Sequence, residues 1–370
     1  MTIHMVDIKN QYLQIKEEID SAIQQVIEST SFINGPAVNE FKRNFENYLG
    51  AKAVIPCANG TDALQIAMMA LGLKPGDEVI VPAFTYVATA EVIALLNLVP
   101  VMVDVNENTF NVSLDNIKGK VTSKTKAIVP VNLYGQCADL YNIKEFAKEN
   151  NLLVIEDNAQ AIGSDFIYSD GSKIKAGLIG DIGTTSFYPS KNLGAYGDGG
   201  ACYTNNIELA ERIRMVANHG QSKKYIHNII GCNSRLDSLQ AAILDVKLKY
   251  LDKYAESRNL VADYYDKHLS SIPDIQIPFR AEYSTHVFHQ YTLKVKNGKR
   301  DELKMYLKGF GIPTMIYYPL PLYQQKAYSS KEKLPVTEML CNEVLSIPIH
   351  TEMNEEKLQF ISDKIHSFFN

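Results

Sequence analysis

The chain has 370 residues, of which 46% are hydrophobic and 21% charged, and it carries a formal net charge of −5. This composition is that of an ordinary globular protein and excludes a disordered, collagenous or repeat-dominated chain, and the length predicts about two domains. The slight excess of acid and the lack of a basic patch argue against nucleic acid as a partner.

The predicted elements begin with helices and change to alternating strands and helices at residue 53. Apolar residues recur at helical spacing over 9–29 and 37–49. Short apolar runs then alternate with helical segments, which predicts an α/β domain with a mainly parallel, seven-stranded sheet flanked by helices. The predicted strands are 53–56, 79–83, 100–104, 127–132, 152–156, 184–188 and 200–204, and the helices are 61–72, 87–97, 142–150 and 206–217.

A smaller α+β unit is expected at the C-terminal end. A long helical stretch over 236–270 connects it to the first unit, and we place the large domain at 1–250 and the smaller one at 251–370. In the smaller domain, strands are predicted at 289–296 and 313–318, and helices at 300–309, 337–344 and 354–368.

Cysteine usage and the N-terminal residues predict a reduced, cytoplasmic protein. The five cysteines lie far apart, form no C-x-x-C pair and are odd in number, which argues against a disulfide framework. Charged residues come too early for a signal peptide, and no segment has the roughly 18 uninterrupted apolar residues of a membrane span. We therefore expect no membrane contact.

The first candidate functional segment is a helix N-terminus that follows a predicted strand directly. Gly60 and Thr61 open this helix and offer free N–H groups and a hydroxyl to an anion. The segment is compatible with a phosphate-binding site, but taken alone it is more typical of an ordinary helix cap, and both interpretations stay open here.

Two further segments carry candidate chemistry. Asp157 follows the predicted strand 152–156 at the carboxyl edge of the sheet, where open α/β sheets bind ligands; it could hold a protonated ring nitrogen or cap a loop. Lys191 stands in FYPSKNLGAYGDGG, among aromatic residues and glycines. A lysine in apolar surroundings has a lowered pKa and is a usable nucleophile, so we favour a catalytic lysine over a solvated one.

Together these segments resemble the DegT/DnrJ/EryC1/StrS family of nucleotide-sugar aminotransferases. The resemblance covers nearly the whole chain and is strongest to the branch that aminates C3 of 3-oxo sugars, such as UDP-2-acetamido-2-deoxy-3-oxo-glucuronate. It implies a fold-type I transferase that depends on pyridoxal 5'-phosphate (PLP). Further matching segments are PAFTYVATAE at 82–91, VNLYGQCADL at 131–140, NHGQ at 218–221, NSRLDSLQAAIL at 233–244 and YYPLPLYQQ at 317–325.

The resemblance implies a role for each matched residue. Lys191 would bind the cofactor covalently and act as the proton shuttle, and Asp157 would pair with the pyridinium nitrogen. Gln160 would lie near the ring hydroxyl, with Tyr86 and Ala159 on opposite faces of the ring. The remaining matches are the phosphate binders Gly60, Thr61 and Ser186, Asn233 reaching in from a second subunit, and the substrate-binding residues Arg235 (also across the dimer), Tyr317 and Tyr318.

The implied reaction is a ping-pong transamination in a homodimer with shared active sites. L-glutamate would convert PLP to pyridoxamine 5'-phosphate (PMP) and leave as 2-oxoglutarate, and a nucleotide-linked keto sugar would take the amino group. The product would serve O-antigen, other lipopolysaccharide or deoxyamino-sugar biosynthesis. Close family members carry His-Tyr-Pro where this chain has Tyr317-Tyr318-Pro319, so a positive charge is lost there and a uronate substrate is less favoured.

Several alternatives remain. The acceptor could be aminated at C4 of a 4-oxo sugar, or the chain could be a PLP-binding regulator without turnover. Lys191 argues against the dehydratase branch of the family, in which histidine replaces this lysine. The lack of a G-x-G-x-x-G opening argues against a Rossmann-type nucleotide binder. If the segment 286–289 is extended, His286 and His289 face opposite sides of it, so no metal site is expected.

Overall fold

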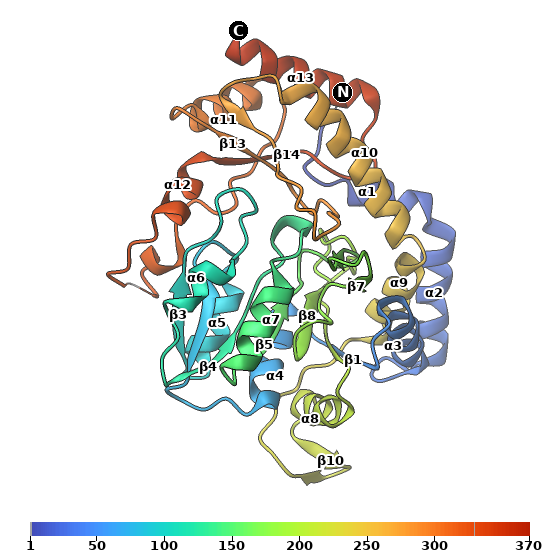
Figure 1. The fold of residues 1–370 in the computed structure, drawn as a ribbon. Helices are drawn as coiled ribbons and strands as arrows, with labels where there is room; N and C mark the ends of the chain where they lie inside the picture. Colours follow the sequence, from blue (N-terminus) through green and yellow to red (C-terminus); the bar gives the residue numbers. More distant parts are fainter. Residues whose placement is uncertain (1, 329) are drawn as a thin grey trace.

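The computed structural model describes residues 2–328 and 330–370. Figure 1 shows a large central sheet with helices on both faces, and a smaller unit of helices and strands from the C-terminal part of the chain above it. The long helix α10 (Leu251–Leu269) runs from the large unit to the smaller one.

The central sheet confirms the predicted fold class. Its seven strands lie in the order β1-β9-β8-β5-β4-β2-β3, and only β9 runs against the others. The predicted strand 127–132 ends early because Pro130 has no N–H to donate to the ladder. The strands are β1 (Ala53–Cys57), β2 (Glu78–Pro82), β3 (Val99–Val103), β4 (Thr125–Ile128), β5 (Leu153–Asp157), β8 (Ile182–Ser186) and β9 (Gly200–Thr204).

Helices cover both faces of this sheet. The four predicted between the strands are present, and a short one, α6 (Leu114–Lys118), was not predicted. Two small hairpins extend from the large unit: β6 (Asp165–Ile167) with β7 (Lys173–Lys175), and β10 (Gln221–Lys223) with β11 (Ile226–His227). The four helices are α4 (Gly60–Leu71), α5 (Ala88–Leu95), α7 (Leu140–Glu149) and α8 (Ile207–Ala217).

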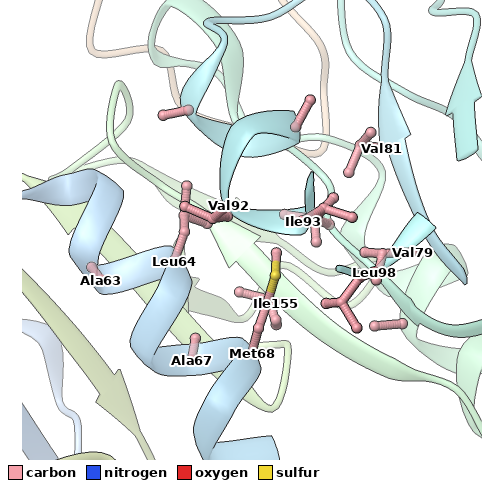
Figure 2. Packing of buried hydrophobic residues seen from close by; sticks show 14 of the residues in the cluster. Ala63, Leu64, Ala67, Met68, Val79, Val81, Val92, Ile93, Leu98 and Ile155 are labelled. Atoms are coloured by element: carbon pink, nitrogen blue, oxygen red, sulfur yellow. The ribbon is translucent and has the colours of Figure 1, made fainter. Parts of the chain in front are cut away.

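Local interactions explain where helix α4 begins and ends. The Asn59 side chain accepts a hydrogen bond from the Asp62 N–H at 2.8 Å, and Gly72 ends the helix with a left-handed φ of 77°. Figure 2 shows Met68 of α4 packed toward Ile155 of β5, and both side chains are fully buried. Burial of each contributes about 1.5–3 kcal/mol. This packing fixes the N-terminus of α4 relative to the strand that ends in Asp157.

Two predicted helices are interrupted. The segment 9–29 forms α1 (Ile8–Gln14) and α2 (Lys16–Ser29), and the segment 236–270 forms α9 (Ser238–Leu248) and α10. Between α9 and α10 the Tyr250 N–H donates to the Lys247 carbonyl, a tighter bond than the helical i→i−4 pattern. The apolar spacing continues across both breaks and so conceals them. Helix α3 (Pro36–Leu49) was predicted and packs with α2 against α9.

The C-terminal unit corrects one predicted strand. The segment 313–318 forms only a single bridge, between Met315 and Ser346, and Pro313 has no N–H for a ladder. Strand β13 pairs instead with β12 on one side and with β14 on the other, and β14 begins where the predicted helix 337–344 should end. The elements are β12 (Ile275–Gln276), β13 (Tyr291–Val295), β14 (Val344–Ile347), α11 (Arg300–Gly309), α12 (Pro335–Glu343) and α13 (Glu355–Phe369). The domain boundary at residue 250 remains a prediction.

Candidate active site

The predicted phosphate-binding residues come together at the carboxyl ends of two strands. Gly60 opens α4 just beyond β1, and Ser186 is the last residue of β8. A Cβ on Gly60 would lie 2.6 Å from the Ser186 Cβ, so only glycine permits this approach. The N–H groups of Gly60 and Thr61 have no acceptor in the described part of the chain. Two free donors at a helix N-terminus beside a serine can bind an anion.

Asp157 is a buried carboxylate at the end of β5, with only 6% of its surface exposed. Its Oδ2 accepts a hydrogen bond from Thr89 Oγ1 at 2.8 Å, and its Oδ1 accepts one from the Ala159 N–H at 3.2 Å. Burial raises the pKa of Asp157, while the two donors and the Lys191 ammonium oppose that rise. A carboxylate in this position can pair with a buried N–H⁺ of a ligand.

Lys191 lies in the loop between β8 and β9, and its side chain is half-buried. Burial lowers the pKa of Lys191 to about 8, and the nearby carboxylate of Asp157 limits that fall. An amine with this pKa is roughly one-tenth neutral at pH 7, far more than an ordinary lysine. The neutral amine of Lys191 can therefore act as a nucleophile.

Gln160 and Tyr318 join the two units of the fold at this site. Gln160 Oε1 accepts a hydrogen bond from the Tyr134 N–H at 3.0 Å, and its Nε2 donates to Tyr318 Oη at 3.1 Å. Tyr318 follows α11 in the sequence, so this bond brings the C-terminal segment to the sheet edge. The Tyr134 hydroxyl donates to the Tyr317 carbonyl. Burial raises the pKa values of both Tyr317 and Tyr318, so both phenols stay neutral.

Tyr86 supplies an exposed aromatic ring beside these groups. Its ring centroid lies 6.4 Å from that of Tyr318, and 58% of its surface is exposed. Ala159 is half-buried and lies two residues after Asp157, which ends β5. An exposed ring at the edge of a polar site can stack on a flat ligand.

Asn233 and Arg235 are not joined to this group by any contact that the described residues make. Asn233 is exposed and forms a bridge with Asn218, and Arg235 is half-buried. Ser234 between them is buried, and its Oγ accepts a hydrogen bond from the Ala58 N–H at 3.0 Å. Their predicted roles across a dimer stay predictions, as do the roles of the other site residues.

Three residues of this region were not predicted from the sequence. Thr89 binds Asp157, and its only sequence signal is a polar residue within an apolar helix. Asn192 is buried next to Lys191 and donates to the Val287 carbonyl at 2.9 Å. His289 is buried, and burial together with Lys191 holds its pKa well below the usual range.

The two histidines of the HVFH segment do not share a ligand. The His286 ring stacks on Phe288 at 3.8 Å, and its Nδ1 accepts a hydrogen bond from the Phe288 N–H. Within residues 2–328 and 330–370, no group of three or more His, Cys, Asp or Glu side chains is placed to hold a metal ion. In the same residues, no helix combines the length and apolarity needed to cross a membrane.

Comparison with known proteins identifies the family and agrees with the fold. The sequence profile of the DegT/DnrJ/EryC1/StrS aminotransferase family matches residues 13–366. The chain belongs to this family. The resemblance, the α/β fold and the enzyme class expected from the sequence are thereby confirmed.

Individual relatives span the whole chain. It is 45% identical to the "Pleiotropic regulatory protein" of Geobacillus stearothermophilus, over 100% of this chain and 99% of the relative. It is 44% identical to the UDP-2-acetamido-2-deoxy-3-oxo-D-glucuronate aminotransferase of Pseudomonas aeruginosa, over 97% and 98%. The crystal structure of NtdA from Bacillus subtilis with bound cofactor PMP superposes with a TM-score of 0.89 at 33% identity, over 96% of this chain and 82% of NtdA.

Proposed function

We propose that this aminotransferase moves the amino group of L-glutamate to C3 of a nucleotide-linked 3-oxo sugar by a ping-pong mechanism. The observation that carries the proposal is the pair formed by Lys191 and Asp157. A lysine with a pKa of about 8 and a buried carboxylate interact electrostatically at one sheet edge. Transamination needs both a reactive amine and an anion that stabilises a protonated ring.

The residues at this edge fit PLP, which is a flat ring bearing an aldehyde, a basic nitrogen and a phosphate. When bound, the cofactor supplies an electron sink that lets an amino group pass between two carbon skeletons. The free N–H groups of Gly60 and Thr61, with Ser186 beside them, suit the phosphate. Asp157 suits the ring nitrogen, and the exposed Tyr86 ring suits one face. Ala159 would lie on the other face, and Gln160 near the ring hydroxyl.

Lys191 carries the covalent attachment and the proton movement. Its Nζ would hold the cofactor covalently between turnovers. As a free amine, Nζ would move the proton from the α-carbon of the amino donor to the cofactor, and in the second half of the cycle it would move a proton from the cofactor to the acceptor carbon. A pKa of about 8 suits an atom that must both accept and donate a proton near neutral pH.

Asp157 acts as a carboxylate that stays ionised although it is buried. Two hydrogen bonds, from Thr89 and Ala159, hold the carboxylate oriented and oppose the effect of burial on its pKa. The bond between a carboxylate and a protonated nitrogen is charge-assisted and stronger than a neutral one.

The substrate side of the proposal rests on Tyr317 and Tyr318. Both are neutral phenols, which can bind sugar hydroxyls but offer no positive charge to a uronate. Arg235, with Asn233, would complete the site from the partner subunit of a homodimer. The two tyrosines by themselves therefore favour a neutral 3-oxo sugar on UDP or dTDP over a uronate.

The first test replaces the reactive amine. Lys191→Ala should remove turnover while leaving the fold intact, because general acid–base help alone contributes roughly 10²–10⁴-fold. The matched control is Lys126→Ala, an exposed lysine on β4, which should keep wild-type activity. More than about one per cent of the wild-type kcat in a folded Lys191→Ala protein would contradict the role of Lys191.

The wild-type protein with its cofactor separates the alternative functions. A visible cofactor band that bleaches on addition of L-glutamate supports an enzyme, whereas a band that persists supports the non-turnover regulator suggested by the name of the Geobacillus relative. Product analysis with a panel of 3-oxo and 4-oxo nucleotide sugars then decides between C3 and C4 amination.

A further inference from the structure

Lys247 is a buried lysine that the mechanism above does not use. It lies on α9 with 1% of its surface exposed, and it forms no ion pair with a carboxylate anywhere in residues 2–328 and 330–370. Burial and the nearby Arg258 lower the pKa of Lys247 to about 8. An apolar side chain would avoid the desolvation cost of such a group, and its neighbours on α9, Leu244 and Leu248, are apolar.

The side chain of Lys247 contacts two residues of the loop that carries Lys191. Its Nζ donates to the Gly194 carbonyl at 2.5 Å and lies 5.1 Å from the centre of the Tyr196 ring. A carbonyl oxygen and an aromatic face both favour a cation over a neutral group. Within the described residues, the hydrogen bond of this ammonium and its contact with an aromatic ring are therefore both made within five residues of Lys191.

The turn between Lys191 and Gly194 is tight and depends on outside support. The Lys191 N–H donates to the Tyr188 carbonyl, and a Cβ on Gly194 would lie 2.3 Å from the Pro189 oxygen. The Tyr196 N–H donates to Gln240 Oε1 at 2.8 Å, so a second residue of α9 also holds the loop. Positions 240 and 247 are two helical turns apart and share a face of α9.

Helix α9 is a rigid base for these contacts. It packs against α2 and α3, and Leu244 and Leu248 are buried in one cluster with Phe41, Phe45 and Phe187. Phe187 begins the loop of Lys191, so the loop is fixed by apolar packing at its start and by polar bonds at its turn.

We propose that Lys247 is a positioning residue for Lys191: its buried ammonium holds the Gly194 carbonyl and thereby fixes the turn that presents the reactive amine. The proposal rests on the function proposed above, in which Lys191 is that amine. It assigns to α9 a role in the reaction although no α9 side chain contacts Lys191 in the described residues.

The test compares Lys247→Met and Lys247→Gln with a matched control, Lys175→Met. Lys175 makes the same two kinds of contact elsewhere: its Nζ donates to the Gly163 carbonyl at 3.2 Å and lies 5.2 Å from the centre of the Tyr48 ring. Unlike Lys247, it is half-buried and also forms an ion pair with Asp165 at 3.0 Å. Methionine keeps the length of the side chain and removes the charge, and glutamine keeps a hydrogen-bond donor.

Three experiments are carried out on the full-length protein. Hydrogen exchange of the peptide 187–199 is followed with and without PLP, the pKa of Lys191 is taken from the pH dependence of its acetylation in the PLP-free protein, and kcat and KM are measured on the holoenzyme. In Lys247→Met we expect exchange of this peptide alone to rise about tenfold, the pKa of Lys191 to change and kcat to fall by roughly 10–100-fold at nearly constant KM. Lys247→Gln should fall between Lys247→Met and the wild type, and Lys175→Met should match the wild type.

Several results would overturn the proposal. One is a kcat within about twofold of the wild type in Lys247→Met, even with faster exchange. Another is an equal loss of kcat in Lys175→Met. A third is an increase in hydrogen exchange throughout the chain in Lys247→Met, or failure of both Lys247 variants to fold, because Lys247 would then support the fold in general. The exchange and acetylation measurements need no reaction, so they remain interpretable if Lys191→Ala refutes the proposed function.

Discussion

Thr89 is the residue on which the charge of Asp157 depends most directly. Its hydroxyl is fully buried and donates to Asp157 Oδ2, and apart from it only the Ala159 N–H donates to this carboxylate within the described residues. Hydrogen bonds to charged groups contribute about 1.5–3 kcal/mol, twice as much as neutral ones. Without this donor, burial alone would raise the pKa of Asp157 further and weaken its hold on a protonated nitrogen.

This balance predicts a graded effect of two substitutions. Asp157→Ala should slow proton abstraction by at least about 100-fold, and Thr89→Val should slow it by roughly tenfold, because the second leaves the carboxylate with one donor. Stopped-flow bleaching of the cofactor band with L-glutamate measures the step. The control is Thr185→Val, a buried threonine whose hydroxyl donates to the Asn158 carbonyl and not to Asp157. A normal rate in Asp157→Ala would remove this carboxylate from the mechanism.

At the scale of elements, the site depends on how closely α4 and β8 approach each other. Gly60 and Ser186 are in such contact that no side chain fits between them, and the approach aligns the free N–H groups of α4 with the serine. The packing of Met68 against Ile155 fixes the rest of the helix, so the N-terminus cannot shift freely to relieve a clash.

Gly60→Ala should therefore weaken cofactor binding. The new Cβ would lie 2.6 Å from the Ser186 Cβ and must push α4 away from β8, so we expect the Kd for PLP to rise at least about tenfold. Titration of PLP-free protein by absorbance measures it. The control is Gly119→Ala, where a Cβ meets nothing within 4 Å, and its Kd should not change. An unchanged Kd in Gly60→Ala would show that this helix N-terminus does not bind the phosphate.

The sequence predicts best at the scale of helices and strands. Apolar runs marked most strands of the large sheet but not β8, whose sequence is IGTTS and which was predicted two residues too late. Because parallel strands bring their carboxyl ends together, Asp157 and the Gly60 segment could still be assigned to one edge. Thr89 and Lys247 could not be found in this way, since only the folded chain brings α5 beside β5 and α9 beside the Lys191 loop. The break at Tyr250 and the strand β14 were hidden for a related reason: local apolar spacing does not record tertiary pairing.

In the whole molecule, the candidate site lies where the two units meet. Tyr318 from the C-terminal unit binds Gln160 of the large unit, and the Asp104 carboxylate accepts hydrogen bonds from the N–H groups of Val336 and Thr337. The smaller unit is thus held against the sheet edge at more than one point (Figure 1). Residues from both units can contact one substrate only in this arrangement, and in the proposed dimer Arg235 would add a third source.

The proposed sharing of sites between subunits predicts complementation between two inactive proteins. Lys191→Ala and Arg235→Ala homodimers should each be nearly inactive, but a mixed dimer has one site with Lys191 from one subunit and Arg235 from the other. Random re-association gives half mixed dimers, each with one complete site of two, so about one quarter of the wild-type activity should return. The control mixture, Lys191→Ala with Asp157→Ala, should stay inactive because both residues are assigned to one subunit's site. No recovery in the first mixture, once mixed dimers are detected by mass spectrometry, would place Arg235 in the site of its own chain or outside the site.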